Sequence, residues 1–507
     1  MRLCTLMIQL KILTTLYLCF EVVASILHSQ KQGATWIVGY DSDKKFPPRY
    51  GKTEMRFTSH GLKLEYNTLE KFASTSFINT SICDSTGKLL LFTEGLNIYG
   101  ADQKIILNGD GLNPGKVRDD YQDSHYPSIY SHVFLGRPQS NDEFFLVHLA
   151  VRWNENVADT IRPSVAEKLY YTRINQSNDN FIVIEKNILL LEREFVKGHM
   201  AYCRHANGRD WWIVLEEYAT NLHFIFLLDP TGIRLHHQQN IGYGGNFYDY
   251  SGNSIFSQDG QKFAKYTYYN SIQIFDFDRC TGYFSNPVHI NVKSFNRYIL
   301  GSLAFSQETK YLYFNNLERI YQIDLQTAAG NYHIDTVGYW DHYYYNDKLP
   351  TAFFNMALGD DGIIYLGCFS SNVYLHTINS PDQKGSQCGF ELRSVVLPAL
   401  MNGALPIMPN FRLGAMKGSR CDSLSNQSTL GCNIESLLYC NFCQDEILLK
   451  DEIENGSVFN IFSLQGKFIC RVQSANHRID VSELVGGMYI LSCIHEEKGD
   501  GIKFMKY

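Results

Sequence analysis

Residues 254–264 run Ser-Ile-Phe-Ser-Gln-Asp-Gly-Gln-Lys-Phe-Ala, a short β-rich segment followed by a polar turn and the start of a second segment. Residues 302–313 and 355–365 repeat this order, and in each unit a further β-rich run follows. Runs of Val, Ile, Tyr and Phe bounded by Gly, Asp, Asn and Ser predict short strands joined by tight turns. The segment therefore belongs to a repeated β unit.

The spacing of these units indicates the kind of repeat. Ser257 and Ser306 occupy the same place in successive turns and are 49 residues apart, and Ser306 and Gly359 are 53 residues apart. A period near 50 residues with several strands per unit is typical of a β-propeller blade, a small sheet that stacks on its neighbours around an axis. The stretch 34–415 has room for six or seven blades. A pair of large β-sandwiches is the alternative, and it does not explain the constant spacing.

Composition agrees with an all-β chain. The 507 residues include 33 tyrosines and 32 phenylalanines, and only 19% are charged. Aromatic residues favour strands over helices. The formal net charge of −7 argues against nucleic acid as a partner.

The N-terminus predicts export. Arg2 and Lys11 supply positive charge, an apolar run follows from Ile12 to Phe20, and small residues begin at Ala24. This order is typical of a cleaved signal peptide, which we place at residues 1–29. The run is shorter than the roughly 20 residues that a membrane anchor requires. No later segment resembles a second span, so we expect no transmembrane helix after the signal is removed.

Cysteine usage is compatible with an oxidising compartment. The sequence has 13 cysteines, and 11 remain once Cys4 and Cys19 leave with the signal. An odd number implies at least one free or intermolecular thiol. Disulfides are plausible outside the cytoplasm, but the sequence leaves their pairing open.

The character of the chain changes after the propeller region. Residues 416–436 are rich in Ser, Gly and Asn and are predicted to form a linker. Residues 437–507 then form a compact set of short β-rich runs, enough for a small β-sandwich. The predicted fold is therefore all-β, a six- or seven-bladed β-propeller followed by a small C-terminal β-sandwich.

The tail resembles the type A C-terminal sorting domain of the type IX secretion system of Bacteroidetes. The resemblance is carried by residues 462–467, 479–490 and 503–506, in the order that the family shows. Its motif residues here are Gly466, Leu484, Gly487, Tyr489 and Lys503. The family's opening Tyr-Pro-Asn-Pro is replaced by Tyr-Cys-Asn-Phe at 439–442. The resemblance implies the type IX secretion machinery as a partner and a location that is secreted or on the outer cell surface, reached through the periplasm.

The N-terminal part is similar to uncharacterised propeller regions that precede such tails in Bacteroidetes. The matching stretches are 36–42, 108–113, 203–212 and 275–282. This similarity implies a secreted β-propeller protein. It implies no catalytic or ligand-binding residues.

Four polar residues form the first candidate for a ligand site. They surround Cys203 and the strand that begins at Trp211, and they are Arg204, His205, Arg209 and Asp210. A nucleophilic cysteine needs a histidine near it in space, which sequence spacing does not establish. The alternative is a polar rim on a hairpin whose turn is Asn207-Gly208. We therefore expect a binding role and no catalytic one.

Three further motifs favour structural interpretations. Cys440-x-x-Cys443 lacks the second pair that a zinc site needs and the helix that a thioredoxin-like site needs. Residues 108–113, Asn-Gly-Asp-Gly-Leu-Asn, resemble part of a calcium loop but fit an ordinary surface turn better. His236-His237 fits a solvated loop. No hydrolase elbow, zinc-protease motif, phosphate loop or dinucleotide fingerprint is present, so we expect no metal and no cofactor.

These observations predict a secreted or cell-surface binding protein whose propeller presents loops to an unknown protein or glycan, an expectation based on fold-level analogy. The rival is a polysaccharide lyase or glycosidase with its site at the propeller channel, which would need two carboxylates or a His/Tyr/Arg set at the channel mouth. A purely structural surface component is the third possibility.

Overall fold

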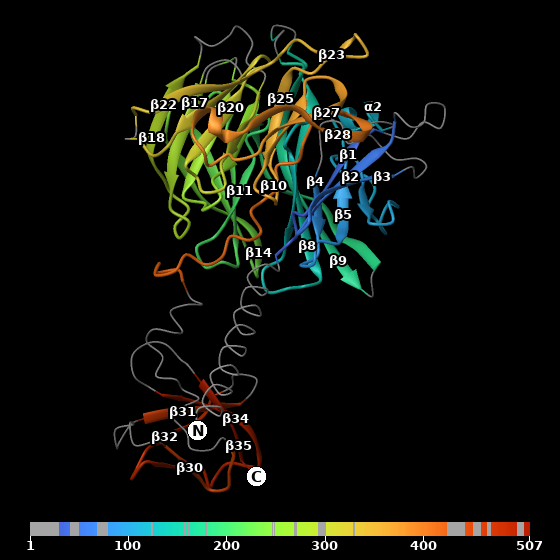
Figure 1. Ribbon diagram of the computed structural model, residues 1–507. Coiled ribbons are helices and arrows are strands. Elements are labelled where there is room, and N and C mark those ends of the chain that lie inside the picture. The colour runs from blue at the N-terminus through green and yellow to red at the C-terminus, as the bar shows by residue number, and fades with distance from the viewer. Residues whose placement is uncertain are drawn as a thin grey trace, which may run out of the picture. The chain divides into compact units, whose positions relative to one another are not determined.

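The computed structural model describes residues 30–40, 50–67, 80–122, 125–156, 159, 162–177, 180–245, 247, 249–267, 271–292, 301–327, 330–422, 442–449, 458–463, 468–493 and 501–506. The predicted signal peptide, 1–29, lies outside the described residues, as does most of the predicted linker. The chain divides into two compact units, Met1–Cys421 and Asp422–Tyr507. Each unit is described here by itself (Figure 1).

Among the described residues of the first unit, seven antiparallel sheets of three or four strands form the propeller, and we call them blades one to seven in chain order. Blade one holds β1 (Thr35–Gly39), β2 (Lys52–Thr58) and β3 (Gly61–Asn67), and blade two holds β4 (Thr80–Cys83), β5 (Leu89–Thr93) and β6 (Ile98–Gly100). Blade three holds β7 (His132–Gly136), β8 (Glu143–Trp153), β9 (Ser164–Ser177) and β10 (Asn180–Phe195). Blade four holds β11 (Ala201–Arg204), β12 (Trp211–Glu216), β13 (Leu222–Asp229) and β14 (Gly232–Asn240).

The last three blades contain the repeats seen in the sequence. Blade five holds β15 (Gly252–Phe256), β16 (Lys262–Thr267), β17 (Ser271–Phe277) and β18 (Phe284–Asn291). Blade six holds β19 (Leu303–Phe305), β20 (Tyr311–Asn315), β21 (Arg319–Asp324) and β22 (His333–Tyr339). Blade seven holds β25 (Phe353–Leu358), β26 (Ile364–Cys368), β27 (Ser371–Ile378) and β28 (Phe390–Asn402). The chain is a β-propeller, and of the two predicted blade numbers the larger is correct.

The blades form a closed ring. First strands of successive blades lie against one another, β1 on β4, β4 on β7, β11 on β15, β15 on β19 and β19 on β25. Apolar clusters fill the spaces between neighbouring blades, because a single small sheet cannot bury both faces alone. The ring closes where Trp36 of blade one meets Tyr365 of blade seven, with ring centroids 6.0 Å apart. Trp36 also packs edge-on against Phe57 at 4.7 Å.

Residues 403–408, near the end of the first unit, pack against blade one. They follow β28 and lie beside β1, where Leu405 and Met408 pack against the cluster that contains Trp36. In the described part of the chain these residues form no strand ladder with β1. Besides side-chain packing, two hydrogen bonds hold them, from the side-chain amide of Asn355 to the carbonyl of Leu405 at 3.0 Å and from the hydroxyl of Tyr202 to the carbonyl of Ile407 at 2.6 Å.

The repeated turn of the sequence joins the first and second strands of a blade. It opens at Ser257, Ser306 and Gly359. In each turn the fourth residue donates its backbone N–H to the carbonyl of the first and has a positive φ, 69°, 58° and 80° respectively. Glycine adopts such a φ without strain, and Thr309 is the exception among the three. Blades two and four have the same turn.

Burial explains the residue pattern of the strands. All six residues of β12 are buried, because both of its faces are covered by neighbouring blades. In β14, at the outer edge of the same blade, most residues are exposed or half-buried. Three smaller elements complete the described part of the unit: the helix α2 (Lys116–Asp120), the 3₁₀ helix η1 (Gly385–Cys388) and a hairpin of β23 (Tyr344–Tyr345) and β24 (Leu349–Pro350). Within the described ranges, no helix is long and apolar enough to span a membrane.

The second unit is a small β-sandwich, as predicted. One sheet has the strand order β29-β35-β34-β31-β32, and the other pairs β30 with β33. The strands are β29 (Phe442–Cys443), β30 (Glu446–Leu448), β31 (Val458–Ser463), β32 (Phe468–Gln473), β33 (Arg478–Asp480), β34 (Gly487–Cys493) and β35 (Gly501–Lys506). Ile447 and Ile479 of the small sheet pack against Phe459 and Leu491 of the large one.

Candidate functional site

The segment 409–421, which we call the strap, crosses the end of the channel where the first strands end. The side-chain amide of Asn410 donates to the carbonyl of Gln258, just beyond β15, at 2.7 Å. The ring of Phe411 meets the ring of Trp211 edge-on, with centroids 5.5 Å apart. The strap therefore runs from blade one to blades four and five on the opposite side of the ring.

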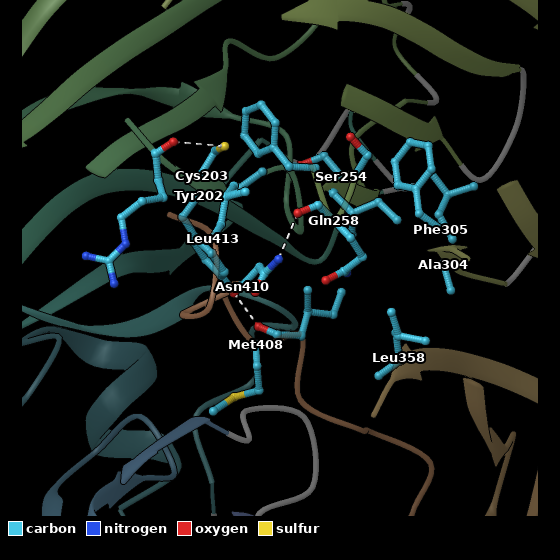
Figure 2. Close-up of a pocket in the computed structure, with 18 of the residues that line it drawn as sticks. Tyr202, Cys203, Ser254, Gln258, Ala304, Phe305, Leu358, Met408, Asn410 and Leu413 are labelled. Atoms are coloured by element: carbon cyan, nitrogen blue, oxygen red, sulfur yellow. Dashed lines mark hydrogen bonds between the residues drawn. The ribbon is translucent and has the colours of Figure 1, made fainter. Parts of the chain in front are cut away.

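A small cavity remains inside the channel behind the strap. Figure 2 shows side chains of β11, β15, β19 and β25 around it, closed on one side by Met408, Asn410 and Leu413. Its volume is about 60 Å³, counted as space for water centres. One water needs roughly 10–15 Å³ by this measure, whereas pockets for drug-sized ligands have about 300–1,000 Å³. The cavity has room for a few waters and none for a sugar ring.

Tyr130 narrows the channel near the beginning of the first strands. It comes from blade three, and its hydroxyl lies beside Ser302 of blade six and Asn355 of blade seven. Burial raises the pKa of this hydroxyl, which forms no hydrogen bond of ordinary geometry. One side chain thus reaches across the channel to the far blades.

The four residues predicted as a ligand site lie together in the turn between β11 and β12. The guanidinium of Arg204 stacks over the ring of Trp211 at 3.9 Å. It donates to the carbonyl of Phe411 in the strap at 3.3 Å and to the carbonyl of Arg209 at 3.0 Å. Burial lowers the pKa of Arg204 to about 10. This residue holds the strap against blade four.

The other three also bind atoms of the chain itself. His205 donates through Nε2 to the carbonyl of Cys280 at 3.2 Å, and its Nδ1 accepts the backbone N–H of Asn207. Arg209 and Asp210 form an ion pair at 2.7 Å. The structure brings the four residues together beside the strap, which Arg204 contacts directly. A ligand at this place stays a prediction.

Arg279 was not singled out in the sequence, although it is the most connected residue of this region. Its guanidinium is almost fully buried and donates only to backbone carbonyls. The acceptors are Arg204 at 2.9 Å, His205 at 3.2 Å, Asp259 at 3.5 Å and Gly414 at 2.6 Å. Four carbonyls around one buried cation tie the turns of blades four and five to the strap. The one sequence feature that could have drawn attention to Arg279 is the turn-like stretch Arg-Cys-Thr-Gly that begins with it.

A disulfide fixes the end of the strap. Cys280, in the turn between β17 and β18, is bonded to Cys421, 141 residues later. Two of the cysteines that the sequence left unpaired are thereby assigned. Cys421 is also the last residue of the first unit.

A buried charged cluster joins blades four and five away from the strap. Glu216 of β12 forms an ion pair with Lys265 of β16 and accepts a hydrogen bond from His199 at 2.7 Å. Burial alone would raise the pKa of Glu216, but the charge of Lys265 and the bond from His199 outweigh it and lower that pKa. All three side chains are at most 4% exposed. The cluster is buried and connects blades four and five.

The polar side chains of the calcium-like loop at 108–113 contact other residues of the chain. The side-chain amide of Asn113 donates to the carbonyl of Gly95, and its oxygen meets Nδ1 of His148 at 2.7 Å. The carboxylate of Asp110 lies 3.4 Å from the amine of Lys186. In the parts of the chain that the structure describes, no group of three or more His, Cys, Asp or Glu residues is placed to hold a metal ion.

The other motifs have these positions. Cys440 lies outside the described residues, and Cys443 is buried in the core of the second unit. His236 and His237 lie side by side on β14, and the ring of His237 stacks on Tyr283 with centroids 4.1 Å apart.

Four of the five sorting-motif residues lie in described parts of the second unit, and Gly466 lies outside them. Tyr489 stacks on Phe504 with centroids 5.6 Å apart, Leu484 packs against the same core, and Gly487 begins β34. Lys503 is in β35, opposite Ile490. The motif positions thus belong to adjacent strands and the loop before β34.

An aromatic hairpin marks the opposite face of the propeller. The loop between β22 and β25 carries Tyr-Trp-Asp-His-Tyr-Tyr-Tyr at residues 339–345. It leads into the beginning of β25, whereas the strap contacts residues at the end of that strand. The hairpin and the strap therefore lie on opposite faces (Figure 1). The sequence reasoning missed this segment, although its density of aromatic residues was a visible signal.

No family model and no curated protein matches the chain. Solved structures similar to it include a putative 6-phosphogluconolactonase from Bacteroides uniformis, with 10% identity, a TM-score of 0.42 and coverage of 72% of this chain and 97% of the other. Virginiamycin B lyase from Staphylococcus aureus has 12% identity, a TM-score of 0.33 and coverage of 65% and 81%. PorZ, a surface component of the type IX secretion system of Porphyromonas gingivalis, has 13% identity, a TM-score of 0.30 and coverage of 90% and 69%. The fold assignment rests on the strand order and packing described above.

Proposed function

We propose that the chain is an exported binding protein whose propeller recognises its ligand on the face that carries the aromatic hairpin. The narrow space inside the channel is the observation that carries this proposal. The strap covers one end, Tyr130 reaches across the other, and the cavity between them holds about 60 Å³. A channel enzyme needs space for a substrate beside its catalytic groups. The described residues that line the cavity include no carboxylate, so loops on a face are the better place for recognition.

Delivery is the second part of the proposal. The signal-like residues 1–29 would take the chain into the periplasm, and the sorting-like tail at 437–507 would take it across the outer membrane. The support is the order of the sequence elements in the tail and the separate compact unit that they form. A tail that forms its own compact unit suits recognition by the type IX secretion machinery.

Deleting residues 437–507 in a Bacteroidetes host tests delivery. We expect the truncated chain to accumulate in the periplasm, while the full chain reaches the medium or the cell surface. Resistance of the retained chain to protease, together with its native Cys280–Cys421 disulfide, would show that the propeller is folded. Unchanged surface delivery of the truncated chain would overturn the sorting role.

A further inference from the structure

We propose that residues 339–345, together with Tyr374 and Arg393, form a binding site for a neutral glycan. We call this set the aromatic ridge. The inference deepens the proposed function, on which it rests, by naming a ligand class and the residues that contact it.

The ridge is held rigidly. Asn346 and Asp347, between β23 and β24, have φ values of 51° and 57°. Two successive residues with positive φ form the type I′ turn that closes a tight hairpin. At its base, the hydroxyl and the backbone N–H of Thr351 both donate to the carbonyl of Tyr343, at 3.0 and 3.1 Å, and the indole N–H of Trp340 donates to that hydroxyl at 3.2 Å. A ligand would meet a preformed surface and not a loop that must first be ordered.

The aromatic rings alternate between two sides of the ridge. On one side, Trp340 lies 4.5 Å from His342 and 5.6 Å from Tyr344 between ring centroids. On the other side, Tyr343 and Tyr345 lie 6.1 and 5.8 Å from the ring of Tyr374, nearly perpendicular to it. Tyr344 and Tyr345 are successive residues of β23 and therefore point to opposite sides, whereas His342, with a φ of 59°, lies where the chain is not extended.

The rings are offered to solvent. Tyr339 is 60% exposed, Tyr344 44% and Tyr343 41%. Single exposed aromatic side chains are ordinary, but three of them within six residues form a group, and grouped exposed apolar surface marks interaction sites. Tyrosine supplies a flat apolar face and a hydroxyl with few rotatable bonds. A pyranose ring has the matching chemistry, because its C–H face is apolar and its edge carries hydroxyl groups.

Charge decides between ligand classes. Arg393 donates to both carboxylate oxygens of Asp341, at 2.9 and 2.7 Å, and its guanidinium lies over the ring of Tyr343 at 4.5 Å. The bond from Arg393 lowers the pKa of Asp341, so the pair stays ionised and balanced. Asp347 and Lys348 in the turn also balance each other. Arg319, whose guanidinium lies 5.7 Å from the ring centroid of Tyr339, follows Glu318 in the sequence. The formal charges on and beside the ridge therefore sum to about zero, which suits a neutral glycan better than a phosphate, a sulfated sugar or an acidic peptide.

The test measures binding of the purified mature protein to neutral oligosaccharides of glucose, galactose and mannose. Sulfated and uronic-acid oligosaccharides and acidic peptides run in parallel. We expect neutral sugars to bind, and Tyr343→Ala and Tyr344→Ala each to weaken binding roughly tenfold, the loss of one well-placed contact. Tyr343→Phe keeps the ring and should retain most of the affinity.

Tyr283→Ala is the matched control. Tyr283 is 51% exposed and lies in the turn that carries Cys280, on the strap side. Its substitution should leave binding unchanged. Absence of binding to every neutral sugar, binding only to the anionic probes, or neutral-sugar binding that survives both alanine substitutions in the ridge would each overturn the inference. These outcomes do not touch the export test, so failure here is distinguishable from failure of the proposed delivery.

Discussion

At the scale of single residues, the carboxyl group of Glu94 is placed where water does not reach it. It lies in the turn between β5 and β6 with no exposed surface. It accepts hydrogen bonds from the side-chain amide of Asn97 at 2.8 Å and from the hydroxyl of Tyr99 at 3.1 Å. Burial outweighs these bonds and raises the pKa of Glu94 to about 7.

This placement predicts a pH-dependent stability. The pKa of a glutamate in the unfolded chain is about 4.3. Between that value and about 7 the folded state binds more protons, so the free energy of unfolding falls as the pH rises through this window. Glu94→Gln removes the titrating group. We expect its stability relative to wild type to be greater at pH 8 than at pH 5, by up to about 3 kcal/mol.

Urea unfolding at the two pH values measures this difference, and Glu65→Gln serves as a control because its side chain is half exposed. An equal effect of Glu94→Gln at both pH values would contradict the expectation. Buried histidines with lowered pKa, such as His148 and His223, also make stability depend on pH in this window. They are the same in wild type and variant, so the difference between the two proteins isolates the contribution of Glu94.

At the scale of elements, a second prediction concerns the backbone strain in the turn that the blades share. Thr309 has a φ of 58°, which costs a β-branched residue strain of about 1–2 kcal/mol. Thr309→Gly should raise the free energy of unfolding by roughly 0.5–1 kcal/mol, since the flexibility of glycine offsets part of the gain. Denaturant unfolding checks it.

Gly362 provides the matched reverse change. It occupies the equivalent position with a φ of 80°, and a Cβ added there meets no heavy atom within 4 Å. Gly362→Ala therefore tests backbone strain alone and should lower stability by about 1 kcal/mol. If both changes destabilise the protein, φ is not what selects residues at this turn.

These turns explain why the sequence predicts the propeller but not all of it. The Ser-x-Asp-Gly spacing is visible because a tight turn with a positive φ restricts residue choice locally. Blades one and two lack the regular 50-residue spacing and have three strands each, so their number could not be counted. The sequence singled out Arg204, but its hydrogen-bond partner Phe411 lies 207 residues away. No local pattern reveals such a contact.

Other parts of the site escaped prediction for the same reason. The pairing of Cys280 with Cys421 depends on the path of the chain around the ring, which spacing does not encode. The ridge at 339–345 contains no residue pattern typical of catalysis or metal binding. It became a candidate only because the structure places its rings together on one face of the propeller.

At the scale of the whole molecule, the strap and its disulfide determine how firmly the ring is closed. Cross-linking a loop as long as 141 residues removes much of the freedom of the unfolded chain. Replacing Cys280 and Cys421 together by serine should lower the free energy of unfolding by roughly 2–5 kcal/mol. Urea unfolding followed by tryptophan fluorescence measures the change.

Cys470→Ser is the control, because this cysteine belongs to the second unit and forms no disulfide among the described residues. An unfolding midpoint of the double variant equal to that of wild type would show that packing of the strap on Trp211 and Arg279 suffices. A loss of stability in the double variant but not in Cys470→Ser would show that the disulfide is needed to hold the ring closed.

The same disulfide sets the route of mechanical tension. A pull on the C-terminal unit enters the propeller at Cys421 and passes through the sulfur–sulfur bond into Cys280 of blade five. Blades six and seven and the strap lie inside the covalent loop between these two residues, so the pull does not stretch them. A transporter that draws the chain by its tail would therefore strain the early blades first, while the segment that closes the ring stays relaxed.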